Sequence, residues 1–153
     1  MAIKVPPKGT RGVPFPRFLT RFGGAWVRRQ FRRGTLLTQG GIPTLMLETT
    51  GAKSGLPRQA ALGYLEDGSG SWIVIASMAG ASYHPAWLHN LAKDPDATIE
   101  FKDRPRIPVR AEALQGAELE AAWARIARDA PEYVKYRSKT DRELVVVRLR
   151  QRA

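Results

Sequence analysis

The chain has 153 residues, which is enough for one domain with a buried core. Lysine and arginine total 25 against 14 aspartates and glutamates, giving a formal net charge of +11, so the surface should attract polyanions: nucleic acid, anionic lipid or a multiply charged small ligand. Cysteine is absent, and there is no apolar run of the roughly 18 residues needed to span a bilayer, which excludes disulfides, thiolate metal sites and a membrane-spanning helix. The N-terminal sequence has no apolar signal-peptide core, so we expect a cytoplasmic protein.

The N-terminal part combines prolines with a basic amphipathic segment. Residues 1–16 hold four prolines and are expected to be extended or loosely ordered. Residues 15–34 have the periodicity of a helix with arginines on one side, weakened in the middle by Gly23 and Gly24. This helix either packs on its own domain, lies on an anionic membrane, or lines an apolar substrate site. Its apolar side carries Phe15, Phe18, Leu19, Phe22 and Trp26.

The rest of the chain predicts a mainly β, α+β domain over residues 35–153, with residues 1–34 as an N-terminal extension. A tight turn is expected at 67–70, and the strands follow one another as hairpins. Such an order disfavours a parallel sheet and favours a small antiparallel barrel with helices packed around it. The predicted strands are 42–50, 58–67, 71–78, 96–103, 106–114 and 143–150, and the predicted helices are 84–95 and 116–131, with helical spacing again at 133–136.

The connection between the first two strands reads TTGAKSGLPR, residues 49–58. Gly51 and Gly55 allow left-handed backbone and close approach to a ligand, and Ser54 adds a hydroxyl donor. Lys53 and Arg58 add a point charge and a two-pronged donor suited to phosphate or carboxylate. The pattern is not a Walker loop. Taken alone, it favours a polar hairpin whose cations are solvated.

A second cluster joins a strand end to a helix. The run ASMAGAS, residues 76–82, is mostly small, which leaves room for a flat ring beside the backbone. In the following helix Trp87 and Asn90 share a face, although Trp87 could simply be core. His84 and His89 lack carboxylates at ligand spacing, so no metal site is predicted.

The third cluster, APEYVKYRSKTDRE, places two phenols at helical spacing. Tyr133 and Tyr136 lie beside Lys135, Arg137 and Lys139, cations that would ease ionisation of a phenol. A phenol can donate a proton to developing negative charge. Two ordinary surface tyrosines would give the same pattern.

Together the three clusters resemble the deazaflavin (F420)-dependent nitroreductase and quinone reductase family, in matching order over about residues 35 to 148. The resemblance implies a split β-barrel of six or seven antiparallel strands with flanking helices, of the FMN-binding split-barrel type. It also implies an oxidoreductase that transfers a hydride from reduced coenzyme F420 to a quinone, an α,β-unsaturated lactone or ester, or a nitroaromatic. The cofactor's phosphate and anionic oligoglutamate tail would be the polyanion that the excess positive charge attracts.

The resemblance also implies roles for individual residues. Lys53 and Arg58 would hold the phosphate and the first tail carboxylates, helped by donors of the turn that carries Gly51 and Ser54. Tyr133 would supply a proton to the acceptor, assisted by Ser77. The ring would be bracketed by Ala61, Leu62, Gly63, Ala76, Ser77 and Met78, the pocket flanked by Trp87 and Asn90, and the substrate side lined by Tyr133, Tyr136 and Trp26.

The chain departs from this family at three positions. Ala52 stands where arginine is frequent, so tail binding would be either weaker or rebuilt by Arg32 or Arg33. Some members have a lysine where Met78 stands and an aromatic residue where Ala130 stands, so nitroimidazole reduction does not follow from the resemblance.

Alternative interpretations remain open on the sequence. A split barrel could bind FMN or haem instead, or the chain could be a non-enzymatic basic module. Such a module would bind anionic membrane through residues 15–33 or, less readily, nucleic acid, because aromatics and cations do not alternate along any strand. The same segment would allow an F420-dependent enzyme to lie at the inner face of the cell membrane. The oligomeric state is not predicted.

Overall fold

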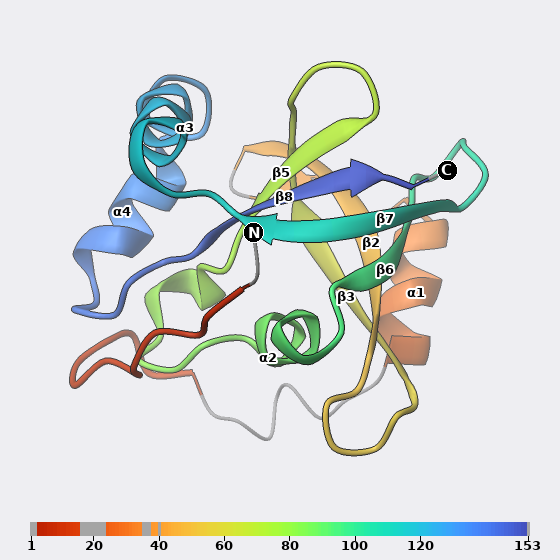
Figure 1. Cartoon of the computed structure of the whole chain (residues 1–153), viewed down its shortest axis with the longest axis horizontal. Helices are drawn as coiled ribbons and strands as arrows, with labels where there is room; N and C mark the ends of the chain where they lie inside the picture. Colours follow the sequence, from red (N-terminus) through yellow and green to blue (C-terminus); the bar gives the residue numbers. More distant parts are fainter. Residues whose placement is uncertain (1–2, 16–23, 35–37, 40, 153) are drawn as a thin grey trace.

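The computed structural model describes residues 3–15, 24–34, 38–39 and 41–152, and for residues 24–27 and 38–39 it describes the backbone alone. A strongly curled antiparallel sheet forms its centre, with helices around it (Figure 1). The helices are α1 (Gly24–Arg32), α2 (Ala86–Lys93), α3 (Gly116–Asp129) and α4 (Glu132–Ser138), with a 3₁₀ turn η2 (Met78–Gly80). The strands are β1 (Thr38–Gln39), β2 (Ile42–Thr50), β3 (Pro57–Gly63), β4 (Leu65–Glu66), β5 (Ser71–Ile75), β6 (Asp96–Glu100), β7 (Ile107–Ala113) and β8 (Val146–Gln151).

Most predicted elements are present with shifted ends. The strand predicted at 42–50 is β2, whereas the one predicted at 58–67 is divided into β3 and β4. The strand predicted at 71–78 ends at Ile75, and the last one begins at Val146. The basic helix predicted at 15–34 appears as α1 from Gly24 onward; its first part, 16–23, lies outside the described residues. Gly24 therefore stands at the start of the described helix.

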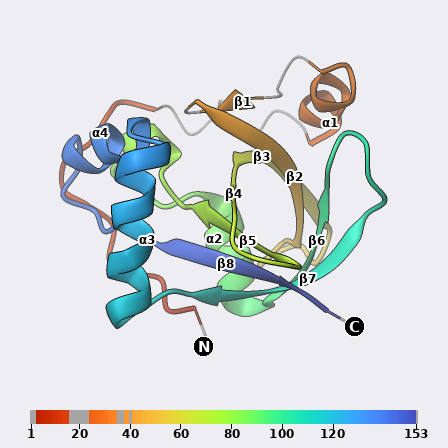
Figure 2. The ribbon, with the colours of Figure 1, turned by 90° about the horizontal axis from the view of Figure 1, so that it is seen from above.

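All strand pairings are antiparallel, as the hairpin order predicted. The sheet runs β1-β2-β6-β7-β8-β5-β4, and β3 pairs with β2. Register is continuous along the β2–β3 hairpin, from Thr44 opposite Gly63 to Thr50 opposite Pro57. Figure 2 shows α3 and α4 at one side of the curled sheet and α1 at the other, where α1 packs against β3. The prediction of a mainly β, α+β barrel-like fold is confirmed.

Two hydrophobic clusters occupy the two faces of the sheet. Alternation along β5 divides its side chains between them, because successive residues of a strand point to opposite faces. Trp72 and Val74 belong to the cluster inside the curl, while Ile73 and Ile75 belong to the cluster under α3 and α4. Burial on both faces explains why the whole of β5 is apolar apart from Ser71. Within the described residues, no helix is both long and apolar enough to cross a bilayer.

Residues 3–15, here called the N-terminal strap, are extended as predicted but not loosely ordered. Ile3 is buried in the inner cluster. The N–H of Gly9 donates to the carbonyl of Ser82 at 2.7 Å, and the N–H of Val13 donates to that of Gly80 at 2.9 Å. These partners could not be predicted from the sequence, because they lie some 70 positions away along the chain.

The far end of the strap is held by a carboxylate. Asp141 accepts from the N–H groups of Thr10 and Arg11, at 2.8 and 3.1 Å, and from the Thr10 hydroxyl. These donors lower the pKa of Asp141 to about 2. The first part of the predicted N-terminal extension is thus attached to the barrel.

Candidate active site

A tight turn joins β2 to β3. The N–H of Gly51 donates to the carbonyl of Leu56 at 2.8 Å, and the N–H of Gly55 donates to that of Gly51 at 2.9 Å. Gly55 has the expected left-handed backbone, with φ +71°. Gly51 is needed because the turn leaves no room for a side chain: a Cβ there would lie 2.6 Å from the Ser54 hydroxyl oxygen. The two glycines therefore close the turn for different reasons.

The two predicted cations of this turn are exposed to solvent. Within the described part of the chain, Lys53 makes no ion pair or hydrogen bond, and Arg58 only reaches the neighbouring Pro57 carbonyl, at 3.4 Å. The backbone N–H groups of Lys53 and Ser54 also have no acceptor there. Two unpaired cations beside two free N–H groups can bind a phosphate or a carboxylate from solvent.

Helix α2 fixes the shape of this turn. The Asn90 side chain, 6% exposed, accepts from the Ala52 N–H at 2.9 Å and donates to the Thr49 hydroxyl at 3.0 Å. Lys93, one helical turn further on, donates to the Ala52 carbonyl at 2.6 Å. Asn90 thus braces the turn, and Lys93 adds a cation that the sequence interpretation missed. Its spacing of three from Asn90 on one helix face was the available signal.

The other predicted residues near this hairpin divide between core and surface. Trp87 is 7% exposed and packs in the inner cluster, as its alternative interpretation held. Leu62 packs against the same cluster from β3. The Ala61 side chain precedes Leu62 in the strand and so points to the other face of β3, while Gly63 has no side chain.

The segment after β5, residues 76–81, is here called the shelf. It contains three successive residues with positive φ: Met78 at +44°, Ala79 at +53° and Gly80 at +84°. For a residue with a Cβ, left-handed backbone costs about 1–2 kcal/mol. At Gly80 an added Cβ would lie 2.8 Å from the Tyr136 carbonyl oxygen, so the shelf packs directly on the backbone of α4. The predicted strand ends at Ile75 because the chain turns here.

A buried arginine that no motif indicated lies behind the shelf. The Arg142 guanidinium donates to the carbonyls of Ala76, Ser77 and Ala81. Its burial lowers its pKa to about 10. The surrounding sequence SKTDRE is polar and is typical of an exposed loop, so sequence patterning could not have identified this residue.

The two predicted phenols meet above the shelf. The rings of Tyr133 and Tyr136 pack edge to face, with centroids 5.5 Å apart. Tyr133 is 4% exposed, and its burial, together with Tyr136, raises its pKa to about 12. Among the described residues its hydroxyl has no hydrogen-bond partner. At neutral pH Tyr133 therefore keeps its proton and is free to donate a hydrogen bond.

The expectation that cations ease the ionisation of this phenol is wrong. Lys135 pairs with Glu132 at 3.0 Å, and the Arg137 guanidinium stacks 4.3 Å above the Trp123 ring. Their charges are engaged elsewhere, while desolvation acts on Tyr133 in the opposite direction. The arrangement suits a group that holds a proton until negative charge develops beside it.

The structure thus assembles two groups of predicted residues. One is the β2–β3 turn with α2, and the other is the shelf with Tyr133 and Tyr136. Met78 and Ser77 belong to the shelf, where Ser77 is 9% exposed. Trp26 lies on α1, but its side chain is outside the described part of the structure.

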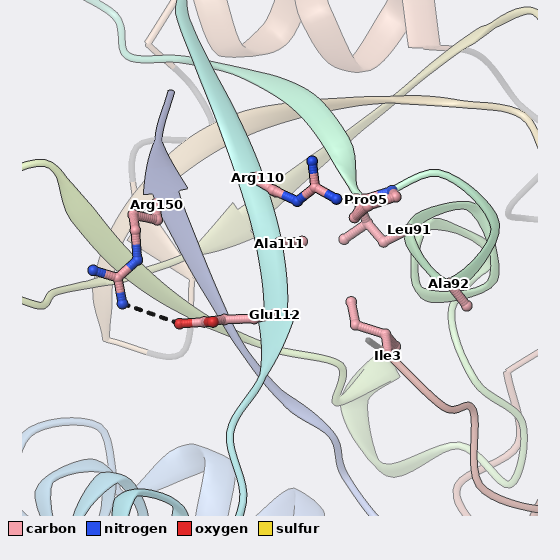
Figure 3. Close-up of a pocket in the computed structure, with 8 residues that line it drawn as sticks. All are labelled: Ile3, Leu91, Ala92, Pro95, Arg110, Ala111, Glu112 and Arg150. Carbon is pink, nitrogen blue, oxygen red and sulfur yellow. Dashed lines mark hydrogen bonds and ion pairs between the residues drawn. The ribbon is translucent and has the colours of Figure 1, made fainter. Parts of the chain in front are cut away.

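Two hollows in the described surface are lined by no residue of the β2–β3 turn, of the shelf or of the tyrosine pair. One, of about 290 Å³, lies between the strap, α2 and β7, with Arg150 paired to Glu112 on its rim (Figure 3). The other is a shallow hollow formed by the four arginines Arg28, Arg29, Arg32 and Arg33 of the α1 region. Among described side chains, no group of three histidines or carboxylates is placed to hold a metal ion.

Comparison with known proteins decides the family. A model of the F420H(2)-dependent quinone reductase family matches residues 21–151. The chain belongs to that family. Its members are oxidoreductases that use coenzyme F420, so the expected family, enzyme class and cofactor are confirmed at that level.

Individual relatives support the same family assignment. An F420H(2)-dependent quinone reductase of Mycobacterium tuberculosis is 36% identical over 116 residues, covering 74% of this chain and 76% of the relative. A solved F420-H2 dependent reductase superimposes with a TM-score of 0.62 at 33% identity, over 70% of this chain and 93% of the other. A second structure, described as a domain-swapped dimer, gives a TM-score of 0.63 at 33% identity, over 81% of this chain and 96% of the other.

Proposed function

We propose that this member of the quinone reductase family oxidises F420H2 and delivers the hydride to a quinone or a similarly electron-poor acceptor. The observation that carries the proposal is the β2–β3 turn. Its Lys53 and Arg58 have no carboxylate partners in the described structure, and Asn90 holds the turn in shape. A braced turn with free cations is what an anionic cofactor tail requires.

The residues present fit the cofactor's chemistry. Lys53, Arg58 and Lys93 would face the phosphate and tail carboxylates, together with the free N–H groups of the turn. The backbone of β3 at 61–63 and that of the shelf at 76–78 would bracket the flat ring. When bound, F420H2 supplies a hydride, and the protein supplies position and a proton.

Tyr133 is the proposed proton donor to the acceptor. Its free hydroxyl and raised pKa support this role, because the proton stays on the phenol until negative charge appears beside it. Ser77 would assist from the shelf, and Tyr136 would line the acceptor side with Trp26. Ala130 is fully buried and offers no aromatic ring to an acceptor, so we do not assign nitroimidazoles as acceptors.

The test is oxidation of F420H2 by menadione or a coumarin, followed through the recovery of F420 absorbance. We expect turnover with the quinone and binding of F420 by the protein alone. Absence of both would refute the assignment. Purification of a yellow protein that releases FMN on denaturation, or of a haem-loaded one, would favour the corresponding alternative cofactor.

We also propose a cytoplasmic protein that contacts the inner face of the membrane through residues 15–33. The supporting observation is the arginine-lined hollow of α1, where Arg29 and Arg33 are exposed and Arg28 and Arg32 each lie 3.6 Å from Glu100. Sedimentation with vesicles containing anionic lipid tests it, comparing the wild type with the Arg29→Glu, Arg33→Glu double variant. Equal sedimentation of both proteins would exclude this surface. A salt-dependent gel shift with short DNA or RNA would instead favour nucleic-acid binding.

A further inference from the structure

The guanidinium behind the shelf makes an unusual set of contacts. Arg142 is 3% exposed, and its Nε donates to the carbonyl of Ala81 at 2.9 Å. Nη1 donates to the carbonyl of Ala76 at 2.9 Å, and Nη2 to that of Ser77 at 2.7 Å. Nη1 also faces Nδ1 of His84 at 3.1 Å, so this nitrogen accepts while Nε2 donates to the Pro6 carbonyl at 2.8 Å. One side chain therefore connects both ends of the shelf to the N-terminal strap.

No carboxylate neutralises Arg142 within the described residues. Its neighbour Asp141 is turned toward the strap, where it binds Thr10 and Arg11. A buried charge is normally paired, because removing it from water is costly. Uncharged residues could fill the same volume without that cost. We therefore expect a role that needs the several N–H donors of a guanidinium.

The backbone whose carbonyls the Arg142 guanidinium holds indicates what this role is. Met78 and Ala79 have left-handed φ, which residues with a Cβ avoid unless the surroundings impose it. The carbonyl held on one side belongs to Ser77, and the carbonyl held on the other belongs to Ala81. Fixing both flanking peptides leaves the three residues between them, Met78, Ala79 and Gly80, little freedom to relax.

We propose that Arg142 is a positioning residue of the reductase, which holds the shelf in the shape that presents Ser77 and its neighbours to the cofactor ring. The proposal rests on the proposed function, because it takes the shelf to be the ring's seat. Lysine cannot replace Arg142, since an ammonium cannot reach three carbonyls in one plane.

The test compares Arg142→Lys and Arg142→Met with the wild type, using two readouts. Hydrogen exchange of the amides in 76–82 needs no cofactor and reports the bracing itself. Turnover of F420H2 with menadione, together with F420 affinity, reports the consequence. We expect faster exchange in both variants, a fall in kcat of about tenfold to a hundredfold, and an F420 affinity within a few-fold of the wild type, because the tail contacts are elsewhere. Should the methionine variant not fold, the lysine variant still gives both readouts.

Val109→Ala is the matched control, because Val109 is fully buried on β7, a strand that does not pair with β5, the strand that leads into the shelf. It should lose stability while keeping the wild-type kcat and the wild-type exchange at 76–82. Wild-type kcat or unchanged exchange in the Arg142 variants would overturn the positioning role. If the wild type neither binds F420 nor oxidises F420H2, the proposed function fails and the positioning role fails with it; faster exchange would then show only that Arg142 braces a loop.

Discussion

Replacing Asn90 by alanine should loosen the β2–β3 turn by a predictable amount. The side chain makes two hydrogen bonds, to the Ala52 N–H at 2.9 Å and to the Thr49 hydroxyl at 3.0 Å. At about 1 kcal/mol for each bond, the variant should lose about 2 kcal/mol of unfolding free energy, and more if the Ala52 N–H finds no water. Thr49→Val removes only the second bond and should cost about half as much.

Urea unfolding of both variants measures these losses, and hydrogen exchange at Ala52 locates them. The exchange rate of that amide should rise in Asn90→Ala but stay near the wild-type rate in Thr49→Val, which leaves the Ala52 bond in place. F420 affinity should weaken with the first change, because the donors of the turn are no longer held together. A loss below about 0.5 kcal/mol, with slow exchange retained at Ala52, would show that α2 does not brace the turn.

Two further predictions concern titratable groups. Burial and the Arg142 charge lower the pKa of His84, so the unfolded chain takes up a proton more readily; the free energy of unfolding should fall as pH drops below about 6.5. Urea titrations between pH 8 and pH 5 should show this fall reduced in His84→Gln, and an identical pH dependence would contradict it. Tyr133→Phe should leave stability within about 0.5 kcal/mol, because its hydroxyl has no partner among the described residues, yet slow turnover by about a hundredfold with F420 affinity unchanged. Equal effects on turnover and affinity would mean that the phenol binds the cofactor instead of supplying a proton.

The sequence predicted those parts of the fold that local chemistry determines. Hydrophobic patterning placed β2, and the glycine-rich run at 67–70 placed the turn before β5. The helix predicted at 84–95, between Pro85 and Pro95, is α2, although it begins only at Ala86, after Pro85. The basic turn and the tyrosine pair were likewise found, because their residue types carry their chemistry wherever they stand.

What the sequence could not predict depends on contacts between distant segments. Met78 and Ala79 adopt left-handed backbone without being glycine, because Arg142 and α4 hold the loop on both sides. Burial of Arg142 depends on carbonyls more than 60 residues earlier in the chain. The pKa of Tyr133 is raised, whereas the sequence predicted easier ionisation. The reason is that both the packing that desolvates Tyr133 and the partners of the neighbouring cations are tertiary features.

The central claim is that the β2–β3 turn holds the anionic part of coenzyme F420. The direct measurement is a titration of F420 into the wild type, Lys53→Ala and Lys102→Ala, where Lys102 is an exposed cation of the β6–β7 connection that makes no ion pair among the described residues. Losing a hydrogen bond to a charged group should weaken binding by about tenfold or more in Lys53→Ala, while Lys102→Ala should stay close to the wild type. Equal dissociation constants for the two variants would contradict the claim, because the turn's lysine would then contribute no more than any surface charge.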